Sequence, residues 1–265
     1  MQVFQHPAMN TTFTLRFLSE DSQLCKSVAR ICIELIDDLE SRLSRYREGS
    51  DVSQINHMRS GESLFIHETT YNCIRHALEM HSLTMGLFDI TLGKQIEHVK
   101  HNRLGKIPSL LGTLALDPNR PVVHCVVEGR EIDLGGIGKG FALDLAKETA
   151  AQHGIASGLI SAGASTHIAF GESTWPIQLE DLLENKIHLV NQALSVSGIE
   201  IQGHHIIRPD SLDAITQHAR VCVIADSATI ADSLSTAIMI SEPNQIEQIQ
   251  VNTGASTKII MPDKE

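Results

Sequence analysis

Aromatic residues, positive charge and long apolar runs are all scarce in this 265-residue chain. Phe, Trp and Tyr together make up 4% of it, which argues against an aromatic platform for stacking nucleic-acid bases. The 21 Lys and Arg residues are outnumbered by 32 Asp and Glu residues, and the resulting net charge of -11 disfavours binding to a phosphate backbone. No apolar stretch reaches the roughly 18 residues of a membrane-spanning helix. We therefore expect neither nucleic acid as a partner nor a membrane span.

Cysteine usage and the first residues of the chain bear on the compartment. The five cysteines are odd in number and form no C-x-x-C pair, so we expect free, reduced and mostly buried thiols. They are Cys25, Cys32, Cys73, Cys125 and Cys222. The N-terminal segment lacks the basic and apolar regions of a secretory signal. We expect a cytoplasmic protein, and a monomer by default.

Apolar periodicity predicts helices and strands mixed within one domain over residues 1–265. A period near 3.6 predicts helices at 22–43, 52–55, 68–83, 142–153 and 229–239. Alternation or short apolar runs predict strands at 11–18, 121–127, 131–134, 158–161, 177–179, 187–190, 193–196 and 220–225. Segment 94–121 contains prolines and a glycine that interrupt the pattern, so it is expected to be a connection or an insertion. Because strands and helices do not alternate regularly, the expected fold class is α+β.

The most informative segment is DLGGIGKGFALD at 133–144. Its four glycines stand where an expected strand turns into an expected helix, so the backbone can approach a ligand and present helix N–H groups to an anion. Lys139 adds a mobile positive charge suited to a phosphate oxygen. The segment is neither a Walker A sequence nor a G-x-G-x-x-G fingerprint. From the residues alone, a tight structural turn is an equally good interpretation.

A second segment places Asp232 and Thr236 four residues apart on an expected helix. At that spacing both side chains project from one face, and a carboxylate with a hydroxyl suits a hard cation such as Mg²⁺. The alternative, favoured when the pair is taken alone, is a helix cap or a helix-dipole pairing by Asp232.

Two other segments are ambiguous by themselves. His204 and His205 come before a short apolar stretch and a proline, where they would supply a general base near neutral pH or simply form a surface turn. Segment 86–92 (GLFDITL) places Asp89 shortly after a helix-ending glycine.

Taken in chain order, these segments resemble the ApbE family of FAD:protein FMN transferases, which move FMN from FAD onto a Ser or Thr of a partner protein. The resemblance spans nearly the whole chain, and its most diagnostic parts are the glycine–lysine turn and the ADSLSTA helix. It is carried by segments 9–13 (MNTTF), 44–47 (SRYR), 87–89 (LFD), 133–140 (DLGGIGKG), 205–207 (HII) and 231–237 (ADSLSTA).

The resemblance implies an α+β fold, related to the T-fold, in which two packed lobes hold the flavin in the groove between them. It implies that Mg²⁺ is held by Asp232, Thr236 and a backbone oxygen of Gly136, and that His205 is the catalytic group. The FAD contacts that it implies are Met9, Tyr46, Leu87, Phe88, Asp89, Asp133, Lys139 and Ile206.

The implied chemistry agrees with these residue types. Bound Mg²⁺ and Lys139 would neutralise charge on the pyrophosphate, while His205 would take the proton of the attacking hydroxyl as AMP leaves. The acceptor protein would carry a Ser/Thr-Gly-Ala-Thr/Ser motif. If water attacked instead, the same site would hydrolyse FAD to FMN and AMP.

Three departures from the family pattern keep an alternative open. The family's Met-Gly-Thr is Met-Asn-Thr at 9–11, its Asn-Ala-Gly-Gly-Asp loop is Ser-Ala-Gly-Ala-Ser at 161–165, and its His-Ile-Ile-Asp-Pro is His-Ile-Ile-Arg-Pro at 205–209. These changes leave the metal pair intact but alter the expected flavin grip and reverse a charge beside His205. The alternative is a FAD-binding or FAD-hydrolysing relative without transferase turnover.

One further pattern lies near the C-terminal end. Segment 250–256 (QVNTGAS) resembles the acceptor motif, which raises the hypothesis that Thr253 is itself modified with FMN. A coincidental surface turn is the favoured interpretation.

Overall fold

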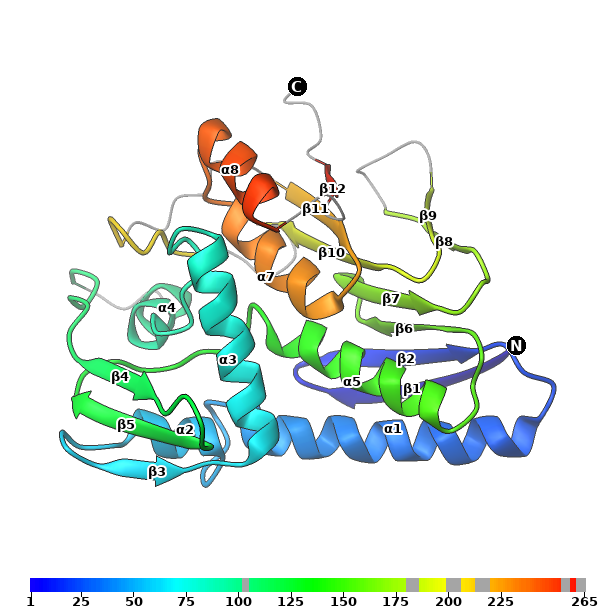
Figure 1. Ribbon diagram of the computed structural model, residues 1–265, viewed down its shortest axis with the longest axis horizontal. Coiled ribbons are helices and arrows are strands. Elements are labelled where there is room, and N and C mark those ends of the chain that lie inside the picture. The colour runs from blue at the N-terminus through cyan, green and yellow to red at the C-terminus, as the bar shows by residue number, and fades with distance from the viewer. Residues whose placement is uncertain (102–104, 180–185, 199–205, 213–219, 254–257, 261–265) are drawn as a thin grey trace.

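A seven-stranded sheet forms the centre of the computed structural model, and all of its neighbouring strands pair antiparallel (Figure 1). The structure describes residues 1–101, 105–179, 186–198, 206–212, 220–253 and 258–260. In sheet order the strands are β1 (Gln2–Ala8), β2 (Thr11–Phe17), β6 (Gly158–Ala162), β7 (Thr166–Phe170), β10 (Ala193–Gly198), β11 (Arg220–Ala225) and β12 (Lys258–Ile260). An antiparallel sheet combined with helices is the α+β class that the sequence predicts.

Helices cover one face of this sheet, with α1 and α5 lying along β1, β2 and β6 and α7 above them (Figure 1). The helices are α1 (Ser22–Leu43), α2 (Asp51–Asn56), α3 (Glu68–Leu83), α4 (Gly93–Lys100), α5 (Gly138–Gln152), α7 (Ala228–Ile238) and α8 (Pro243–Thr253). The boundaries predicted for α1 and α3 are confirmed to the residue. α1 begins after Asp21, whose carboxylate accepts a hydrogen bond from the Leu24 amide at 2.9 Å, as expected of an N-cap.

The central strands are buried on both faces because their side chains alternate between two apolar layers. Ile160, Ile168 and Val223 belong to the main core under the helices. Their neighbours Leu159 and Ala169 belong to a second cluster, together with Trp175. The hairpin of β8 (Trp175–Ile177) and β9 (Ile187–Leu189) supplies that outer layer.

A smaller sheet lies at the other end of the molecule, on the left of Figure 1, beside α2 and α4. Its order is β3 (Ser63–Phe65), β5 (Val122–Val127) and β4 (Thr113–Leu116). β4 and nearly all of α4 fall within segment 94–121, expected to be a connection or an insertion, so it is not a connection without secondary structure. Both elements are short, and β4 depends on pairing with β5, which comes later in the chain.

The strand predicted at 131–134 does not form, although the structure describes all four residues. Glu131 makes a single isolated bridge to Leu92. The backbone of Ile132 is bound instead by one side chain, since Asn56 accepts its N–H at 2.6 Å and donates to its carbonyl at 2.9 Å. An amide side chain thus replaces the partner strand. β8 begins two residues before the strand predicted at 177–179.

Two expectations from composition bear on the fold. All five cysteines are buried and free, as predicted. Within the described ranges, none of the helices combines the length and the apolar character that a bilayer crossing demands.

The start of α7 is bound by a carboxylate from α5. Asp144 accepts hydrogen bonds from the Ala228 and Thr229 amides at 2.9 and 2.8 Å, and from the Ser227 and Thr229 hydroxyls at 2.7 and 2.6 Å. Four donors on one carboxylate satisfy the free N–H groups of the helix N-terminus and favour its dipole. Asp144 therefore joins α5 to α7 just where the glycine turn and the ADSLSTA helix meet.

We predict that Asp144→Ala lowers the free energy of unfolding by about 2 kcal/mol, because it removes the acceptor of all four bonds. The corresponding loss in melting temperature is about 4–8 °C for a chain of this size. Asp21→Ala is the matched control, since Asp21 caps α1 from an exposed position with a single backbone bond. Thermal melts that showed equal losses for the two variants would contradict this role of Asp144.

Candidate functional site

The site is built where α5 crosses α7 at very close range. A Cβ added to Gly140 would overlap the Ala228 carbonyl oxygen and lie 2.9 Å from the Asp232 Cβ. Only glycine permits this approach. The crossing aims the first turn of α5, and therefore its free N–H groups and positive dipole end, at the side chain of Asp232.

Asp232 is 4% exposed and lies among neutral donors from three elements. Its Oδ2 accepts the Gly140 amide of α5 at 3.1 Å. Its Oδ1 faces the Thr166 hydroxyl of β7 at 3.4 Å and the Ser195 hydroxyl of β10 at 3.3 Å. The cap of α7 is Ser227 rather than Asp232, so the interpretation of Asp232 as the cap of its own helix is wrong. Its carboxylate lies instead at the N-terminus of α5.

Gly136 and Thr236 meet beside this carboxylate. A Cβ on Gly136 would lie 3.1 Å from the Thr236 hydroxyl and 3.2 Å from the Phe88 ring. Thr236 donates its hydroxyl proton to the Asp232 carbonyl at 3.1 Å, which leaves the oxygen lone pairs available to another ligand. The three residues expected to hold a metal therefore lie at one corner of the structure.

The donor set at this corner fits a hard cation. The Gly140 amide bonds Asp232 instead of Gly136 four residues earlier, and no hydrogen bond among the described residues ends on the Gly136 carbonyl. Burial and then the negative charge of Asp232 raise the pKa of the nearby Cys73 thiol, so no thiolate is available. No three Asp, Glu, His or Cys side chains converge in the described part of the chain. Carboxylate, hydroxyl and carbonyl oxygens remain, and these are the ligands that Mg²⁺ prefers.

Lys139 places a positive charge against the same carboxylate. Its ammonium group lies 3.9 Å from Asp232 Oδ2 and donates to the Gly135 carbonyl at 3.2 Å. At 3.9 Å the interaction with Asp232 is an ion pair without a hydrogen bond. The ammonium group can therefore turn toward a phosphate at little cost.

The glycine turn is tied to the end of α1 by a buried guanidinium. Arg45, whose side chain is 9% exposed, donates to Glu131 at 2.7 Å, to Asp133 at 3.3 Å and to the Gly93 carbonyl. Asp133 in turn accepts the Gly135 amide at 2.8 Å. Sequence reasoning missed this role of Arg45, although the residue stands in the quoted SRYR segment.

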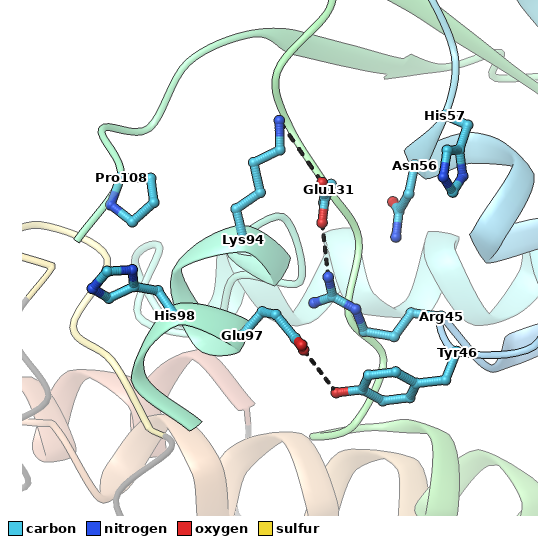
Figure 2. Close-up of a pocket in the computed structure, with 9 residues that line it drawn as sticks. All are labelled: Arg45, Tyr46, Asn56, His57, Lys94, Glu97, His98, Pro108 and Glu131. Carbon is cyan, nitrogen blue, oxygen red and sulfur yellow. Dashed lines mark hydrogen bonds and ion pairs between the residues drawn. The ribbon is translucent and has the colours of Figure 1, made fainter. Parts of the chain in front are cut away.

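Arg45 also lines a cavity of about 430 Å³ (Figure 2). It is lined by Arg45, Tyr46, Asn56, His57, Lys94, Glu97, His98, Pro108 and Glu131. The Tyr46 hydroxyl bonds Glu97 at 3.2 Å, and its ring is 5.6 Å from the Arg45 guanidinium carbon. Partial burial, followed by the negative charge of Asp133, raises the pKa of Tyr46. Among the residues expected to contact FAD, Tyr46 is the one that lines this cavity.

The remaining residues expected to contact FAD differ in how far they are accessible. Leu87, Phe88 and Ile206 belong to the main hydrophobic core, and the Phe88 ring approaches the site at Gly136. Asp89 is partly exposed and accepts both the amide and the hydroxyl of Thr91 at 2.7 Å.

Met9 lies in the two-residue turn between β1 and β2, where its amide donates to Glu40 at 3.0 Å. Asn10 follows it with φ +58°, a left-handed conformation that asparagine tolerates. The change from Met-Gly-Thr to Met-Asn-Thr is therefore compatible with the turn.

The loop at 161–165 is held by a buried histidine. His167 Nε2 lies 3.2 Å from the Ala164 carbonyl and Nδ1 lies 2.9 Å from the Ser161 hydroxyl. Since a carbonyl only accepts, Nε2 carries the proton and Nδ1 accepts from Ser161. Burial lowers the pKa of His167 to about 4. A neutral imidazole thus stabilises a loop that lacks the family's amide and carboxylate.

The Arg208 charge is balanced locally. Its guanidinium makes two bonds to Asp210, at 3.1 and 3.0 Å, lies 3.7 Å from Glu242 and donates to the Ile240 carbonyl beyond the end of α7 at 2.7 Å. The charge reversal in this motif therefore comes with two acidic neighbours.

Two predictions concern residues that the structure does not describe. His205 lies outside the described residues, so its placement relative to Asp232 stays a prediction. Thr253 ends α8 and donates to the Ile249 carbonyl at 2.7 Å, but residues 254–257 of the acceptor-like pattern are also outside the described ranges.

Comparison with known proteins gives a family match along most of the chain. The model of the ApbE family matches residues 9–259. The chain is 27% identical, over 77% of its length and 70% of the relative, to a protein of Buchnera aphidicola subsp. Schizaphis graminum (strain Sg) named FAD:protein FMN transferase.

Two solved structures are also similar. The apo form of the Pseudomonas stutzeri flavinyl transferase ApbE has a TM-score of 0.83 at 24% identity, covering 98% of this chain and 95% of that one. The ApbE protein of Thermotoga maritima has a TM-score of 0.84 at 25% identity, covering 98% and 93%.

The helix crossing generates a prediction about two neighbouring glycines. Gly140→Ala should lower the free energy of unfolding by about 1–3 kcal/mol, because its Cβ would push α5 away from Ala228 and Asp232. Gly138→Ala is the matched control, since a Cβ there meets no atom within 4 Å and alanine gains up to about 1 kcal/mol in a helix. Chemical denaturation of both variants tests the crossing, and an undisturbed Gly140→Ala protein would contradict it.

Burial of neutral His167 generates a prediction about pH. Its pKa is lowered in the folded state from 6.5 to about 4, so the unfolded chain binds this proton more readily. The contribution of neutral His167 to the free energy of unfolding is fully present above pH 6.5. It is lost as the pH drops toward 4, and the loss is on the order of 3 kcal/mol. His167→Gln keeps hydrogen-bonding groups without this titration. Denaturation between pH 7 and 4 should show a flatter profile for the variant, and parallel profiles would refute the assignment.

Proposed function

The chain belongs to the ApbE family, and from that premise we propose that it is a FAD:protein FMN transferase. In the proposed reaction a Ser or Thr hydroxyl of an acceptor protein attacks the phosphorus of the FMN half of FAD. The new bond joins that oxygen to phosphorus, the pyrophosphate P–O bond breaks, and AMP leaves. The acceptor carries a Ser/Thr-Gly-Ala-Thr/Ser motif, and the transferase acts as a monomer.

The observation that carries this proposal is the convergence of Gly136, Asp232 and Thr236 at the crossing of α5 and α7. These three residues would hold Mg²⁺ through a carbonyl, a carboxylate and a hydroxyl oxygen. When bound there, Mg²⁺ supplies positive charge that neutralises the pyrophosphate oxygens as the bond breaks.

The chain's own residues would bind and orient the substrate around that corner. Lys139 can move from its ion pair with Asp232 to a phosphate oxygen, and the first turn of α5 presents its amides to the same group. Tyr46 would contact the FAD from the cavity edge, where Arg45 keeps Asp133 in place. His205 would take the proton of the attacking hydroxyl.

A second candidate is a relative that binds or hydrolyses FAD without transferring FMN. The loop at 161–165 favours it, because Ser165 and Ser161 stand where the family has a carboxylate and an amide. In this chain their hydroxyls are engaged inside the protein, with Ser165 donating to Ala162 and Ser161 to His167. A loop that bonds itself offers fewer polar groups to the flavin.

The proposed function predicts Mg²⁺-dependent release of AMP that Asp232→Asn lowers at least about 100-fold, because the carboxylate charge is lost. The amide can still accept from Gly140 and donate to Thr166 and Ser195, whose hydroxyls can reverse, so the melting temperature should stay close to that of the wild type. Asp226→Asn is the matched control, because it removes the same charge from an exposed position just before α7.

The measurement is chromatography of FAD, FMN and AMP after incubation with Mg²⁺, with and without a peptide carrying the acceptor motif. The transferase yields AMP together with a peptide heavier by FMN, and EDTA stops both. Equal AMP release without peptide would select the hydrolase instead. Tight FAD binding with no AMP in either case would select the binding protein.

A further inference from the structure

We infer that Thr166 and Ser195 are positioning residues that hold the Asp232 carboxylate in the one orientation suited to a cation. This inference rests on the proposed function, because it assigns a task to residues behind the proposed metal corner. Neither hydroxyl belongs to the segments that carry the family resemblance. Both are 0% exposed, so neither is available to solvent or to substrate.

The two hydroxyls approach Asp232 from the sheet, on the side away from Gly140. Thr166 begins β7 and Ser195 lies in β10, which pairs directly with β7 so that these two residues face each other. Their hydroxyl oxygens lie 3.4 and 3.3 Å from Asp232 Oδ1. The helix side of the carboxylate is held by the Gly140 amide on Oδ2 at 3.1 Å. The carboxylate is thus fixed from both ends.

The number of donors decides what remains available on Asp232. An ionised carboxylate has about four acceptor positions, and Thr166, Ser195 and Gly140 use three of them. One position is left, and the Lys139 ammonium group lies 3.9 Å from Oδ2. Because the three protein donors are neutral, they orient the carboxylate without cancelling its charge. A cation can therefore bind at the one acceptor position that is left on the carboxylate, next to its full negative charge.

The direction of the hydroxyl protons follows from the same count. A carboxylate only accepts, so Thr166 and Ser195 must both donate to it, and neither has a second proton to give the other. Ser235, whose oxygen lies 3.2 Å from that of Ser195, donates its own proton to the Asp232 main-chain carbonyl at 3.0 Å. Ser235 in turn lies 2.8 Å from the Ser197 hydroxyl. Ser195 and Ser235 therefore both donate to Asp232, Ser195 to its carboxylate and Ser235 to its main-chain carbonyl, and Ser197 is left to donate to Ser235.

Groups that orient a metal ligand normally change metal affinity by about 10- to 100-fold when they are removed. Removing either hydroxyl would let the carboxylate turn and would leave an empty acceptor position on Oδ1. A role in packing alone would change the stability of the fold without changing the affinity for a cation. The affinity for Mg²⁺ itself therefore distinguishes positioning from packing.

The test is isothermal titration of the full chain with Mg²⁺ alone, for Thr166→Val and Ser195→Ala. We expect each dissociation constant to rise about 10- to 100-fold, and the gain in melting temperature caused by Mg²⁺ to shrink accordingly. Ser233→Ala is the matched control. Ser233 is equally buried and stands next to Asp232 on α7, but its hydroxyl donates only to carbonyls of its own helix, at 2.7 and 3.1 Å. Its affinity should equal that of the wild type.

Thr166→Ser keeps the hydroxyl and should restore the wild-type affinity. Comparison of Thr166→Val with Thr166→Ser therefore tests the inference even if Ser195→Ala fails to fold. Wild-type affinity in Thr166→Val, with binding lost in Asp232→Asn, would overturn this inference and leave the proposed function standing. A wild-type protein that binds no Mg²⁺ would overturn the proposed metal corner itself, and the inference with it.

Discussion

The close crossing of α5 and α7 is the constraint on which the rest of the site depends. Gly140 has no side chain, so the two backbones approach until its amide reaches Asp232. One turn further along α5, Asp144 accepts four hydrogen bonds from the start of α7 and keeps the helices in register. A buried carboxylate is costly unless donors surround it. The crossing supplies one donor and the sheet supplies two, all of them neutral. The carboxylate thus lies among neutral donors at a place toward which a helix N-terminus and Lys139 are directed.

A second buried network connects this corner to the cavity. Arg45 reaches Glu131, Asp133 and the Gly93 carbonyl, so one guanidinium links the end of α1, the start of α4 and the glycine turn. Its planar set of donors suits this task, because a flexible ammonium group could not satisfy three acceptors in fixed directions. The surface beneath a dinucleotide would thus be assembled from three segments distant in sequence. Leu87 and Phe88 belong to the main core, and the Phe88 ring lies against Gly136 of the glycine turn.

The elements that could be predicted are those whose signals are local. α1 and α3 have long amphipathic patterns, and both boundaries are correct. The predictions failed where a partner distant in sequence decides the outcome. Asn56 binds both backbone groups of Ile132, and so the expected strand at 131–134 does not form. β4 exists because β5 pairs with it, although no alternation marks it strongly in the sequence. His167 shows the same limitation, since its buried position beneath the loop depends on the packing of β6 against β7.

By itself, the sequence determined the α+β class, the positions of the principal helices, and the candidate residues Gly136, Lys139, Asp232 and Thr236, because spacing along a helix and glycine at a turn are local properties. It also determined the family, through six short segments in a fixed order. Only the tertiary structure decided that Asp232 faces the N-terminus of α5, that Thr166 and Ser195 stand behind it, and that Arg45 ties the glycine turn to α1. Those contacts join residues between 37 and 92 positions apart, and no local pattern encodes a contact that is made when separate elements pack.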